Sequence, residues 1–486
     1  MASAAPSDAH AAPSKTPPKV VILGGGVIGC SVAYFLRRVL YTGPHTTASA
    51  CARGVPSTIV ERCEIAAAAS GKSGGFLAGG WGDGGVTQAL HRESFALHER
   101  LAADLELKAR SPHAGPRTTA VPRFQSPPST PLNSTPDAFE LHPDIIASYA
   151  TALKTYRKIP TLSVAGGGSL SAQKPPLVSW LDGEIASCLM MDDATAQVTP
   201  LELTTRLHEE AMKLEGSRTI IGEVAGVRLA ARDGSNGRSA SVTGVEVVDA
   251  ETGEMSVLDA DVCVVAMGPW STRASEWFEI DVPMTGIKAR TISHWSPYDR
   301  SVSLLYDASE AVANEPAALF CAEDENDCHL EVYPRSTGEV YICGVGGSEY
   351  VDETRLLPGG DLDRADVVTP DPSRVAAGAK SFAGLSASVG AGGPRKTQSC
   401  MRPCPPDALP ILGAVPGVDG AYMACGHNCW GILWAPVTGR IVSELVVDGK
   451  SRTKIDAFSP GRFTRERGGG RGRGKKIRGD DVGEQW

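Results

Sequence analysis

The glycine-rich stretch at residues 19–36 constrains the fold of this chain more than any other feature. Residues 20–23, Val-Val-Ile-Leu, are four consecutive apolar residues of the kind that form a buried parallel strand. A Gly-x-Gly-x-x-Gly turn follows, and the apolar residues after it recur with helical spacing. In such a unit Gly24 permits the tight turn, Gly26 lets a pyrophosphate approach the backbone, and Gly29 lets the helix lie close to the strand. Because the N-terminus of a helix attracts phosphates, the stretch predicts a dinucleotide-binding strand–turn–helix unit.

A second apolar strand ends in a carboxylate at Glu61. In dinucleotide-binding folds an acidic residue at this place binds the ribose hydroxyls. Glu61 lies 37 residues after Gly24, whereas about 20 is typical. We assign the additional length to a loop insertion at residues 41–55, which is polar and contains glycine and proline and which leaves the strand ends in place. Glu61 is therefore interpreted as the ribose ligand, and the alternative is an ordinary charge at the end of a strand.

The length and the charge of the chain limit its class. A chain of 486 residues exceeds the size of one hydrophobic core and indicates at least two domains. No apolar run approaches the ~18 residues of a membrane-spanning helix, so we predict no membrane span. The net charge is −9, but residues 461–486 hold eight basic and four acidic residues, which leaves −13 on residues 1–460. A body this acidic argues against nucleic-acid binding by the folded part.

The two ends of the chain and its cysteines bear on its location. Residues 1–18 are rich in Ala, Ser and Pro and lack the features of a secretory signal or an arginine-rich transit peptide, so we predict a disordered leader. The basic Gly/Arg tail at residues 464–486 is predicted to be flexible, and both contact with RNA or an anionic surface and a solvated tail without function stay open. Twelve cysteines without a secretory signal indicate free thiols and a cytoplasmic protein, with organellar import left open.

Two Cys-x3-Cys pairs, Cys400/Cys404 and Cys425/Cys429, have a spacing that fits half of a zinc site. Both pairs fall within segments that have a better explanation, given below, so no metal is predicted.

The rest of the chain alternates helices, strands and loops. Residues 66–80 are mostly small and lack hydrophobic periodicity, which is typical of a loop that a ligand approaches closely. Residues 108–137, rich in Pro, Ser and Thr, are predicted to be an exposed insertion. Helices are predicted at 88–107, at 200–214, in the middle of 353–394 and from Val437 onward, and strands at 219–227, 242–248 and 261–267 and over most of 282–345.

Several of these motifs occur in an order that resembles one protein family. They are the strand–glycine turn–helix, Ile59-Val60-Glu61-Arg62, the Ala-Ser-Gly-Lys-Ser-Gly-Gly loop at 69–75, Ala-Met-Gly-Pro-Trp-Ser at 266–271, Arg402-Pro403 with Asp-Ala-Leu-Pro-Ile-Leu-Gly at 407–413, and the segment 426–436. With them the chain resembles the D-amino-acid oxidase superfamily of FAD-dependent oxidoreductases, in the branch of glycine oxidase and sarcosine oxidase. The likeness runs discontinuously from about residue 19 to Phe463, and its most specific part is the C-terminal Gly-His-x-x-x-Gly-Ile-Leu-x-Ala-Pro-x-Thr-Gly.

The resemblance implies FAD as the cofactor and an α/β fold with two domains. A Rossmann-like FAD-binding domain is expected at residues 19–107, 195–275 and 395–463. A discontinuous α+β substrate-binding domain, built on a mixed sheet, is expected at residues 138–194 and 276–394.

The resemblance also assigns contacts with FAD, position by position. The glycine turn faces the pyrophosphate, Glu61 the adenosine ribose, and the backbone at Val224 the adenine. The loop at 70–75 passes beside the phosphates and the flavin ring. The turn at 431–433 meets the pyrimidine oxygen of the flavin, where a positive helix end stabilises the anionic reduced form. The full set of expected contacts is Gly24, Gly26, Val27, Ile28, Gly29, Glu61, Arg62, Ser70, Lys72, Gly74, Gly75, Val224, Gly268, Trp270, Cys400, Gly431, Ile432 and Leu433.

Arg402 lies where glycine-oxidase-like members place an arginine that binds the substrate carboxylate. A planar bidentate donor fixes the substrate so that its α C–H points at the flavin, and the alternative is a surface arginine before a proline turn. The pattern is departed from in three ways: Cys429 replaces a second arginine, Glu331 lies near the place of a substrate-facing tyrosine with Tyr333 two residues on, and His427 and Trp434 add polar and aromatic bulk. A carboxylate in the pocket favours a substrate with a cationic amine, or one that is not a simple amino acid, and disfavours glycine. The expected catalytic residues are Arg402, His427, Glu331 and Tyr333.

Cys400 precedes Arg402 by two residues, the offset of the cysteine that forms an 8α-S-cysteinyl flavin bond in monomeric sarcosine oxidase. That relative has no arginine at the place of Arg402, so the match is partial, and an inert buried cysteine is the alternative.

The expected reaction is oxidation of a small-molecule amine or amino acid, with hydride transfer from a C–N substrate to FAD and reoxidation by oxygen. Two alternatives stay open: a FAD-dependent dehydrogenase that uses another acceptor, and an assembly or trafficking factor in which FAD is structural.

Overall fold

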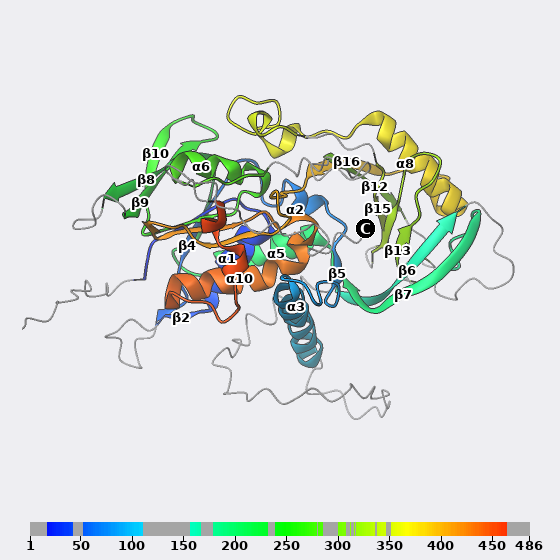
Figure 1. Ribbon diagram of the computed structural model, residues 1–486, viewed down its shortest axis with the longest axis horizontal. Helices are drawn as coiled ribbons and strands as arrows, with labels where there is room; N and C mark the ends of the chain where they lie inside the picture. The colour runs from blue at the N-terminus through cyan, green and yellow to red at the C-terminus, as the bar shows by residue number, and fades with distance from the viewer. Residues whose placement is uncertain are drawn as a thin grey trace, which may run out of the picture.

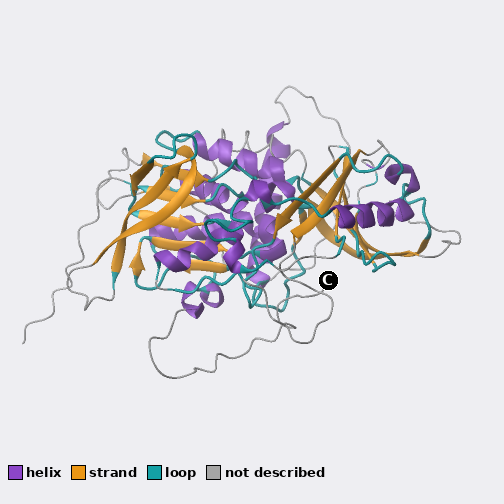
Figure 2. Cartoon of the chain, turned by 90° about the horizontal axis from the view of Figure 1, so that it is seen from above, coloured by secondary structure: helices purple, strands orange, loops and turns teal. Residues whose placement is uncertain are grey.

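Two mixed β-sheets form the framework of the molecule, and most of the helices lie between them (Figure 1, Figure 2). The computed structural model describes residues 17–41, 52–109, 156–166, 178–231, 239–278, 280–284, 300–307, 312, 315, 317–335, 338–346 and 351–463. The predicted leader, the insertion at 108–137 and the basic tail lie almost entirely outside these residues, as do residues 42–51 of the predicted loop insertion. The expected α/β architecture is confirmed, and both of its sheets are mixed.

The first sheet is built around the strand that precedes the glycine turn. Its order is β10-β9-β8-β4-β1-β11-β19-β17, and β18 pairs with β9. The bounds are β1 (Val20–Leu23), β4 (Ser57–Glu61), β8 (Arg218–Ala231), β9 (Ala240–Asp249), β10 (Met255–Asp259), β11 (Val262–Val265), β17 (Ile411–Ala414), β18 (Val418–Asp419) and β19 (Ala421–Cys425). β1 runs parallel to both of its neighbours, β4 and β11, so the carboxyl ends of these three strands lie at one edge. Ligands of open α/β sheets bind at such an edge, where the strand order changes direction.

The second sheet has the order β16-β12-β15-β14-β13-β6-β7-β5. Its strands are β5 (Phe76–Ala78), β6 (Arg157–Gly166), β7 (Ile185–Gln197), β12 (Arg300–Asp307), β13 (Ala318–Cys321), β14 (Glu331–Pro334), β15 (Glu339–Cys343) and β16 (Lys396–Met401). One face packs against α8 (Pro372–Leu385), where Phe382 lies in the same buried cluster as Leu304, Val332 and Ile342. The other face carries Tyr333 and Tyr341 and meets the loop at 70–75 through Gly74. A separate two-stranded sheet joins β2 (Leu40–Tyr41) and β3 (Ala52–Arg53).

The helices begin and end as follows. The α-helices are α1 (Val27–Arg38), α2 (Ala69–Lys72), α3 (Gln88–Ala109), α5 (Pro200–Met212), α6 (Ala274–Trp277), α8, α9 (Ala387–Gly390) and α10 (Gly431–Asp448). The 3-10 helices are η1 (Gly268–Arg273), η2 (Glu353–Arg355), η3 (Ala365–Val367), η4 (Asn428–Trp430), η5 (Asp456–Phe458) and η6 (Pro460–Phe463). Within the described residues, no helix combines the length and the apolar character needed to cross a membrane.

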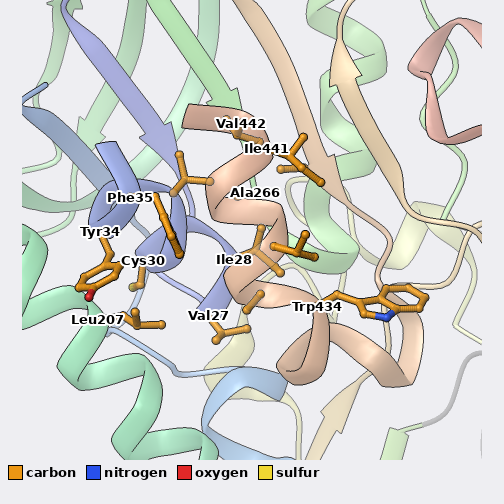
Figure 3. Packing of buried hydrophobic residues seen from close by; sticks show 14 of the residues in the cluster. Val27, Ile28, Cys30, Tyr34, Phe35, Leu207, Ala266, Trp434, Ile441 and Val442 are labelled. Atoms are coloured by element: carbon orange, nitrogen blue, oxygen red, sulfur yellow. The ribbon is translucent and has the colours of Figure 1, made fainter. Parts of the chain in front are cut away.

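The helix that follows the glycine turn lies in the centre of the largest core. Residues 27–36 of α1 are all buried, and Figure 3 shows the side chains of Val27, Ile28, Cys30, Tyr34 and Phe35 between α10 and Leu207 of α5. Ser31 donates a hydrogen bond to the carbonyl of Ala435 at 2.8 Å. A Cβ on Gly439 would lie 2.6 Å from the Ser31 carbonyl oxygen, so the two helices cross with almost no space between their backbones. α1 therefore packs against the first sheet on one side and against α10 on the other.

The last long helix begins six residues earlier than the sequence predicts, at Gly431 and not at Val437. That prediction was wrong, because Pro436 lies within the second turn of the helix and does not bound it. Pro436 has no N–H for the carbonyl of Ile432, one turn earlier, but His98 Nε2 of α3 lies 3.3 Å from this oxygen. The next N–H, of Val437, donates to Ser94 Oγ at 3.2 Å. Side chains of α3 thus replace the helical hydrogen bonds that the proline disturbs.

The strands divide between the two sheets mostly along the predicted domain ranges. Strands within 195–275 lie in the first sheet, and those within 276–394 lie in the second. β5 and β16 depart from this division, because both pair in the second sheet although their residues fall in ranges expected for the FAD-binding domain. The chain therefore passes between the sheets more often than the ranges imply, and the division into domains stays a prediction.

Candidate active site

The glycine turn lies at the carboxyl end of β1 and has a conformation that only glycine accepts. Gly24 has a φ of +107°, and a Cβ on it would lie 2.4 Å from the carbonyl oxygen of Ala266, at the end of β11. A Cβ on Gly29 would lie 2.0 Å from the Gly24 carbonyl oxygen. The turn is thus packed between two strand ends, with α1 pressed against it.

The backbone at the same edge is accessible at three other glycines. A Cβ on Gly26 would meet only Ser70, one on Gly431 would meet only the Cβ of His427 at 3.7 Å, and one on Gly268 would meet no atom within 4 Å. A flat, phosphate-bearing ligand needs such places of close approach to the backbone. Val27 and Ile28 have buried side chains, so only their N–H groups face this edge, and that of Val27 donates to Ser70 Oγ at 2.8 Å. The arrangement fits a dinucleotide.

Glu61 closes the turn from the side of β4. Its carboxylate accepts hydrogen bonds from the N–H of Gly25 at 2.7 Å and the N–H of Cys63 at 3.0 Å. Burial raises the pKa of Glu61 above its usual value, and the backbone donors oppose this shift. The sequence brings Glu61 to the glycine turn as predicted, and its contact with a ribose stays a prediction.

The neighbouring predicted residues form a polar network beyond Glu61. Arg62 pairs with Glu223 at 2.9 Å and with Asp363 at 3.2 Å. Val224, next to Glu223, is buried, so only its backbone can contact a ligand. The indole N–H of Trp270 donates to the carbonyl of Leu362 at 2.9 Å. The structure therefore ties Arg62 and Trp270 to residues 362–363, which the sequence did not predict.

The loop at 70–75 connects the glycine turn to the second sheet. Lys72 Nζ donates to the carbonyl of Ser399 at 3.0 Å, and Gln398 donates back to the carbonyl of Lys72 at 3.0 Å. This places Lys72 beside Cys400, which is buried on β16. At the end of the loop a Cβ on Gly74 would lie 2.5 Å from the ring of Tyr333, and one on Gly75 would lie 1.9 Å from the Val198 carbonyl oxygen. The loop lies between the two sheets, where the flavin is expected.

Glu331 and Tyr333 meet on β14 of the second sheet, and the charge of Arg402, directly after β16, acts in the same region. The Tyr333 hydroxyl donates to Glu331 Oε2, and burial together with this carboxylate raises the pKa of Tyr333 well above its usual value. Burial also raises the pKa of Cys343 and of Cys429, Glu331 raises both further, and Arg402 opposes this. The opposite charges of Glu331 and Arg402 therefore act on the same two thiols. Cys429 itself is exposed to solvent.

Aromatic rings from four segments line the same region. Phe76 lies with its ring centroid 5.0 Å from Trp81, 5.3 Å from Phe320 and 5.8 Å from Tyr333. Trp81 also meets Trp430 at 6.2 Å. Trp81 Nε1 is fixed by Asp192 at 2.8 Å. Sequence reasoning missed Phe76, Trp81 and Phe320, because no local pattern links segments that only the pairing of distant strands in the second sheet brings together.

His427 makes its contacts with α10. It is buried, its Nε2 lies 3.0 Å from Thr438 Oγ1 of α10, and its ring meets that of Trp434. Burial lowers its pKa to about 3, so the ring is neutral. The catalytic role predicted for His427 stays a prediction. Its contacts with Thr438 and Trp434 indicate that it supports α10. Ile432 and Leu433 are likewise buried, so the turn at 431–433 can offer only backbone groups to a ligand.

Two further observations concern the cysteines. The eleven cysteines within the described residues are free thiols. Among those residues, no three His, Cys, Asp or Glu side chains gather in a way that could hold a metal ion. The predicted bond between Cys400 and a flavin stays a prediction.

Comparisons with known proteins identify a family. The family described as DAO, FAD dependent oxidoreductase, matches residues 19–445. The protein TDA3 of Saccharomyces cerevisiae is 23% identical over 91% of this chain and 94% of its own length. The hydrogen cyanide synthase subunit HcnC of Pseudomonas aeruginosa is 25% identical over 92% of this chain and 96% of its own. Among solved structures, glycine oxidase from Bacillus cereus superposes with a TM-score of 0.58 at 19% identity, covering 93% of this chain and 99% of that one, which shows a shared fold.

Proposed function

This chain belongs to the DAO family of FAD-dependent oxidoreductases, and from that membership we propose that it oxidises the C–N bond of a small amino acid or amine and returns the electrons to oxygen. FAD, when bound, accepts the hydride and passes two electrons to oxygen, which is released as hydrogen peroxide. The substrate loses a hydride and a proton and becomes an imine. The protein's own residues have to hold the cofactor, orient the substrate and exclude water.

The proposed cofactor site runs along the carboxyl edge of the first sheet. The glycine turn and the N-terminus of α1 receive the pyrophosphate, because their backbone is open at Gly26 and a helix N-terminus attracts anions. Glu61 receives the adenosine ribose. The loop at 70–75 and the turn at Gly431 would hold the flavin, and the N-terminus of α10 at Gly431 carries the partial positive charge of its helix dipole. Such an end stabilises negative charge on a reduced ring.

One observation carries the proposal for the substrate: the opposite charges of Arg402 and Glu331 shift the pKa of the Cys429 thiol in opposite directions, and Cys429 lies two residues before the turn at Gly431. An amino acid carries a negative carboxylate and a positive ammonium group, which are complementary to the charges of Arg402 and Glu331. Arg402 binds the carboxylate through two parallel hydrogen bonds, and Glu331 receives the ammonium group. Tyr333 donates to Glu331 Oε2 and so keeps the carboxylate in place. The aromatic rings around Phe76 exclude water from the reacting carbon.

We further propose that the reaction takes place in the cytoplasm. Free thiols at all described cysteines are typical of a reducing compartment and support this location.

The test is anaerobic mixing of the flavin-loaded protein with a panel of primary and N-methyl amino acids and their carboxylate-free amines. The proposal expects the absorbance of oxidised flavin to disappear with at least one amino acid, and hydrogen peroxide to form in stoichiometric amounts when oxygen is admitted. Bleaching that oxygen does not reverse indicates a dehydrogenase with another acceptor. A flavin that no amine or amino acid bleaches contradicts the proposal and favours a structural FAD.

A further inference from the structure

Residues 351–368, which we call the cover segment, lie across the carboxyl edge of the first sheet. In the chain they follow β15 and precede α8, both of which belong to the second sheet or its outer layer. In Figure 1 they form the yellow loop that extends from the side of α8 over α2 toward α6. The segment thus leaves one sheet to pack on the other.

Apolar side chains hold the cover segment to the first sheet. Val351, Leu356, Leu362 and Val368 are buried in the same cluster as Val21, Leu23, Val60 and Val265 of β1, β4 and β11. Because these strands supply the edge at which the glycine turn lies, the segment packs beside that edge.

Polar contacts tie the segment to the ends of two strands. After β4, Arg62 donates to the carbonyl of Asp363 at 2.8 Å and to its carboxylate at 3.2 Å, and Cys63 Sγ lies 3.4 Å from Asp366 Oδ1. After β11, Trp270 donates to the carbonyl of Leu362 at 2.9 Å, and Thr272 donates to Glu353. The segment therefore bridges the ends of the two strands that flank β1.

These contacts lie at one half of the dinucleotide site. The acidic residue at the end of the second strand binds the adenosine ribose in dinucleotide folds, and Glu61 holds that position. Arg62 and Cys63 follow Glu61 directly in the chain. The residues that the cover segment contacts are therefore the neighbours of the residue expected to bind the ribose. The loop at 70–75 and the turn at Gly431, where the flavin is expected, make none of these contacts.

We propose that the cover segment encloses the adenosine half of the bound dinucleotide, and that the contact between Arg62 and Asp363 keeps it closed and limits the rate of FAD release. Both side chains are partly exposed, at 26% and 16%, so the contact can open without disrupting the core. The inference rests on the FAD site proposed above but not on the substrate. Asp363 is a positioning residue: it acts through Arg62 and the segment, and not on the reacting atoms.

The experiment measures FAD release from the holoenzyme after dilution, followed by the rise in free FAD fluorescence. Asp363→Ala is expected to release FAD at least tenfold faster than the wild type, since a charged hydrogen-bonded contact is lost. The matched control is Asp361→Ala, which removes a carboxylate of the same segment that pairs with Arg355 and is 61% exposed. Its release rate is expected to stay within twofold of the wild type. Equal rates in the wild type and Asp363→Ala, or equal acceleration by both variants, overturn the proposal.

Two further measurements locate the effect. If the contact with Arg62 is the latch, Arg62→Met combined with Asp363→Ala releases FAD no faster than Arg62→Met alone; additive acceleration contradicts this. Displacement of FAD from the holoenzyme by ADP, which shares the adenosine half, is expected to need the same ratio of ADP to FAD in Asp363→Ala as in the wild type. If Asp363→Ala needs a much lower ratio of ADP to FAD, the variant has lost affinity for the flavin half and not for the adenosine half, which overturns the proposal. Glu61→Ala separates the two claims, because unchanged FAD release in this variant contradicts the dinucleotide site itself.

Discussion

His98 Nε2 lies 3.3 Å from the carbonyl oxygen of Ile432, the acceptor that Pro436 leaves without a helical donor. Ser94, one turn earlier on α3, accepts the N–H of Val437 at 3.2 Å. The helix that begins at Gly431 can therefore contain a proline in its second turn because another helix supplies the missing partners. This is the helix whose N-terminus we place against the flavin.

The first prediction concerns the stability that this contact provides. His98→Leu leaves the buried Ile432 carbonyl without a donor and is expected to lower the free energy of unfolding by about 1–3 kcal/mol. Urea unfolding measures the change. Pro436→Ala restores an N–H that can donate to the Ile432 carbonyl. Added to His98→Leu, it should therefore recover part of the lost free energy of unfolding. Added to the wild type, it should increase that free energy by less. A double variant no more stable than His98→Leu contradicts the explanation.

The second prediction concerns pH. Burial lowers the pKa of His98 to about 4 and that of His427 to about 3, from a usual value near 6.5. As the pH falls below about 6.5, the unfolded chain binds protons that the folded protein excludes. Stability from these residues is therefore complete above about pH 6.5 and is lost toward pH 4 and pH 3, by up to about 1.4 kcal/mol per pH unit for each histidine. Unfolding free energies at pH 7, 6 and 5 should fall less steeply in His427→Asn; an identical slope counts against the prediction.

The third prediction tests the glycine turn. The wild type is expected to carry about one FAD per chain, read from its absorbance spectrum. Gly29→Ala is expected to lose it, because the new Cβ would lie 2.0 Å from the Gly24 carbonyl oxygen and push the turn out of place. Gly253→Ala is the control: Gly253 has a positive φ of 71°, which Gly29 does not have, but it lies between β9 and β10 with no atom within 4 Å of the added Cβ. Full FAD content in Gly29→Ala would show that the turn does not bind the cofactor.

Local patterns in the sequence were sufficient for the first half of the site. The apolar run of β1, the glycine spacing and the carboxylate at Glu61 each depend on neighbours in the chain, and the structure brings them together as predicted. The ring cluster of Phe76, Trp81 and Phe320 could not be predicted in this way. Its members come from segments more than 200 residues apart, and only the pairing of β5 with the second sheet brings them into contact.

Two errors in the predicted elements have physical causes. Pro436 is ordinarily a reason to end a helix, and only the position of His98 on another helix removes that reason. β10, at Met255–Asp259, was not predicted because it is a largely exposed edge strand, so it has no buried face to produce an alternating pattern. In both places, contacts between segments distant in the chain determine the secondary structure.

The fourth prediction concerns Arg402, which we expect to bind the substrate carboxylate. Arg402→Met keeps much of the volume and removes all five donors. The concentration of amino acid needed for half-maximal flavin reduction should rise by roughly 10- to 150-fold, the equivalent of about 1.5–3 kcal/mol for a charged hydrogen bond. FAD content should not change. Arg395→Met is the control, because Arg395 pairs with Asp307 and Glu339 at the edge of the second sheet.

The most direct test compares anaerobic flavin reduction by one amino acid and by the same molecule without its carboxylate, in the wild type and in Arg402→Met. We predict that the wild type is reduced by the amino acid at much lower concentration than by the amine, and that Arg402→Met abolishes this difference while Arg395→Met keeps it. Reduction of Arg402→Met by the amino acid at wild-type concentrations, or a wild-type flavin that neither compound reduces, would contradict the account.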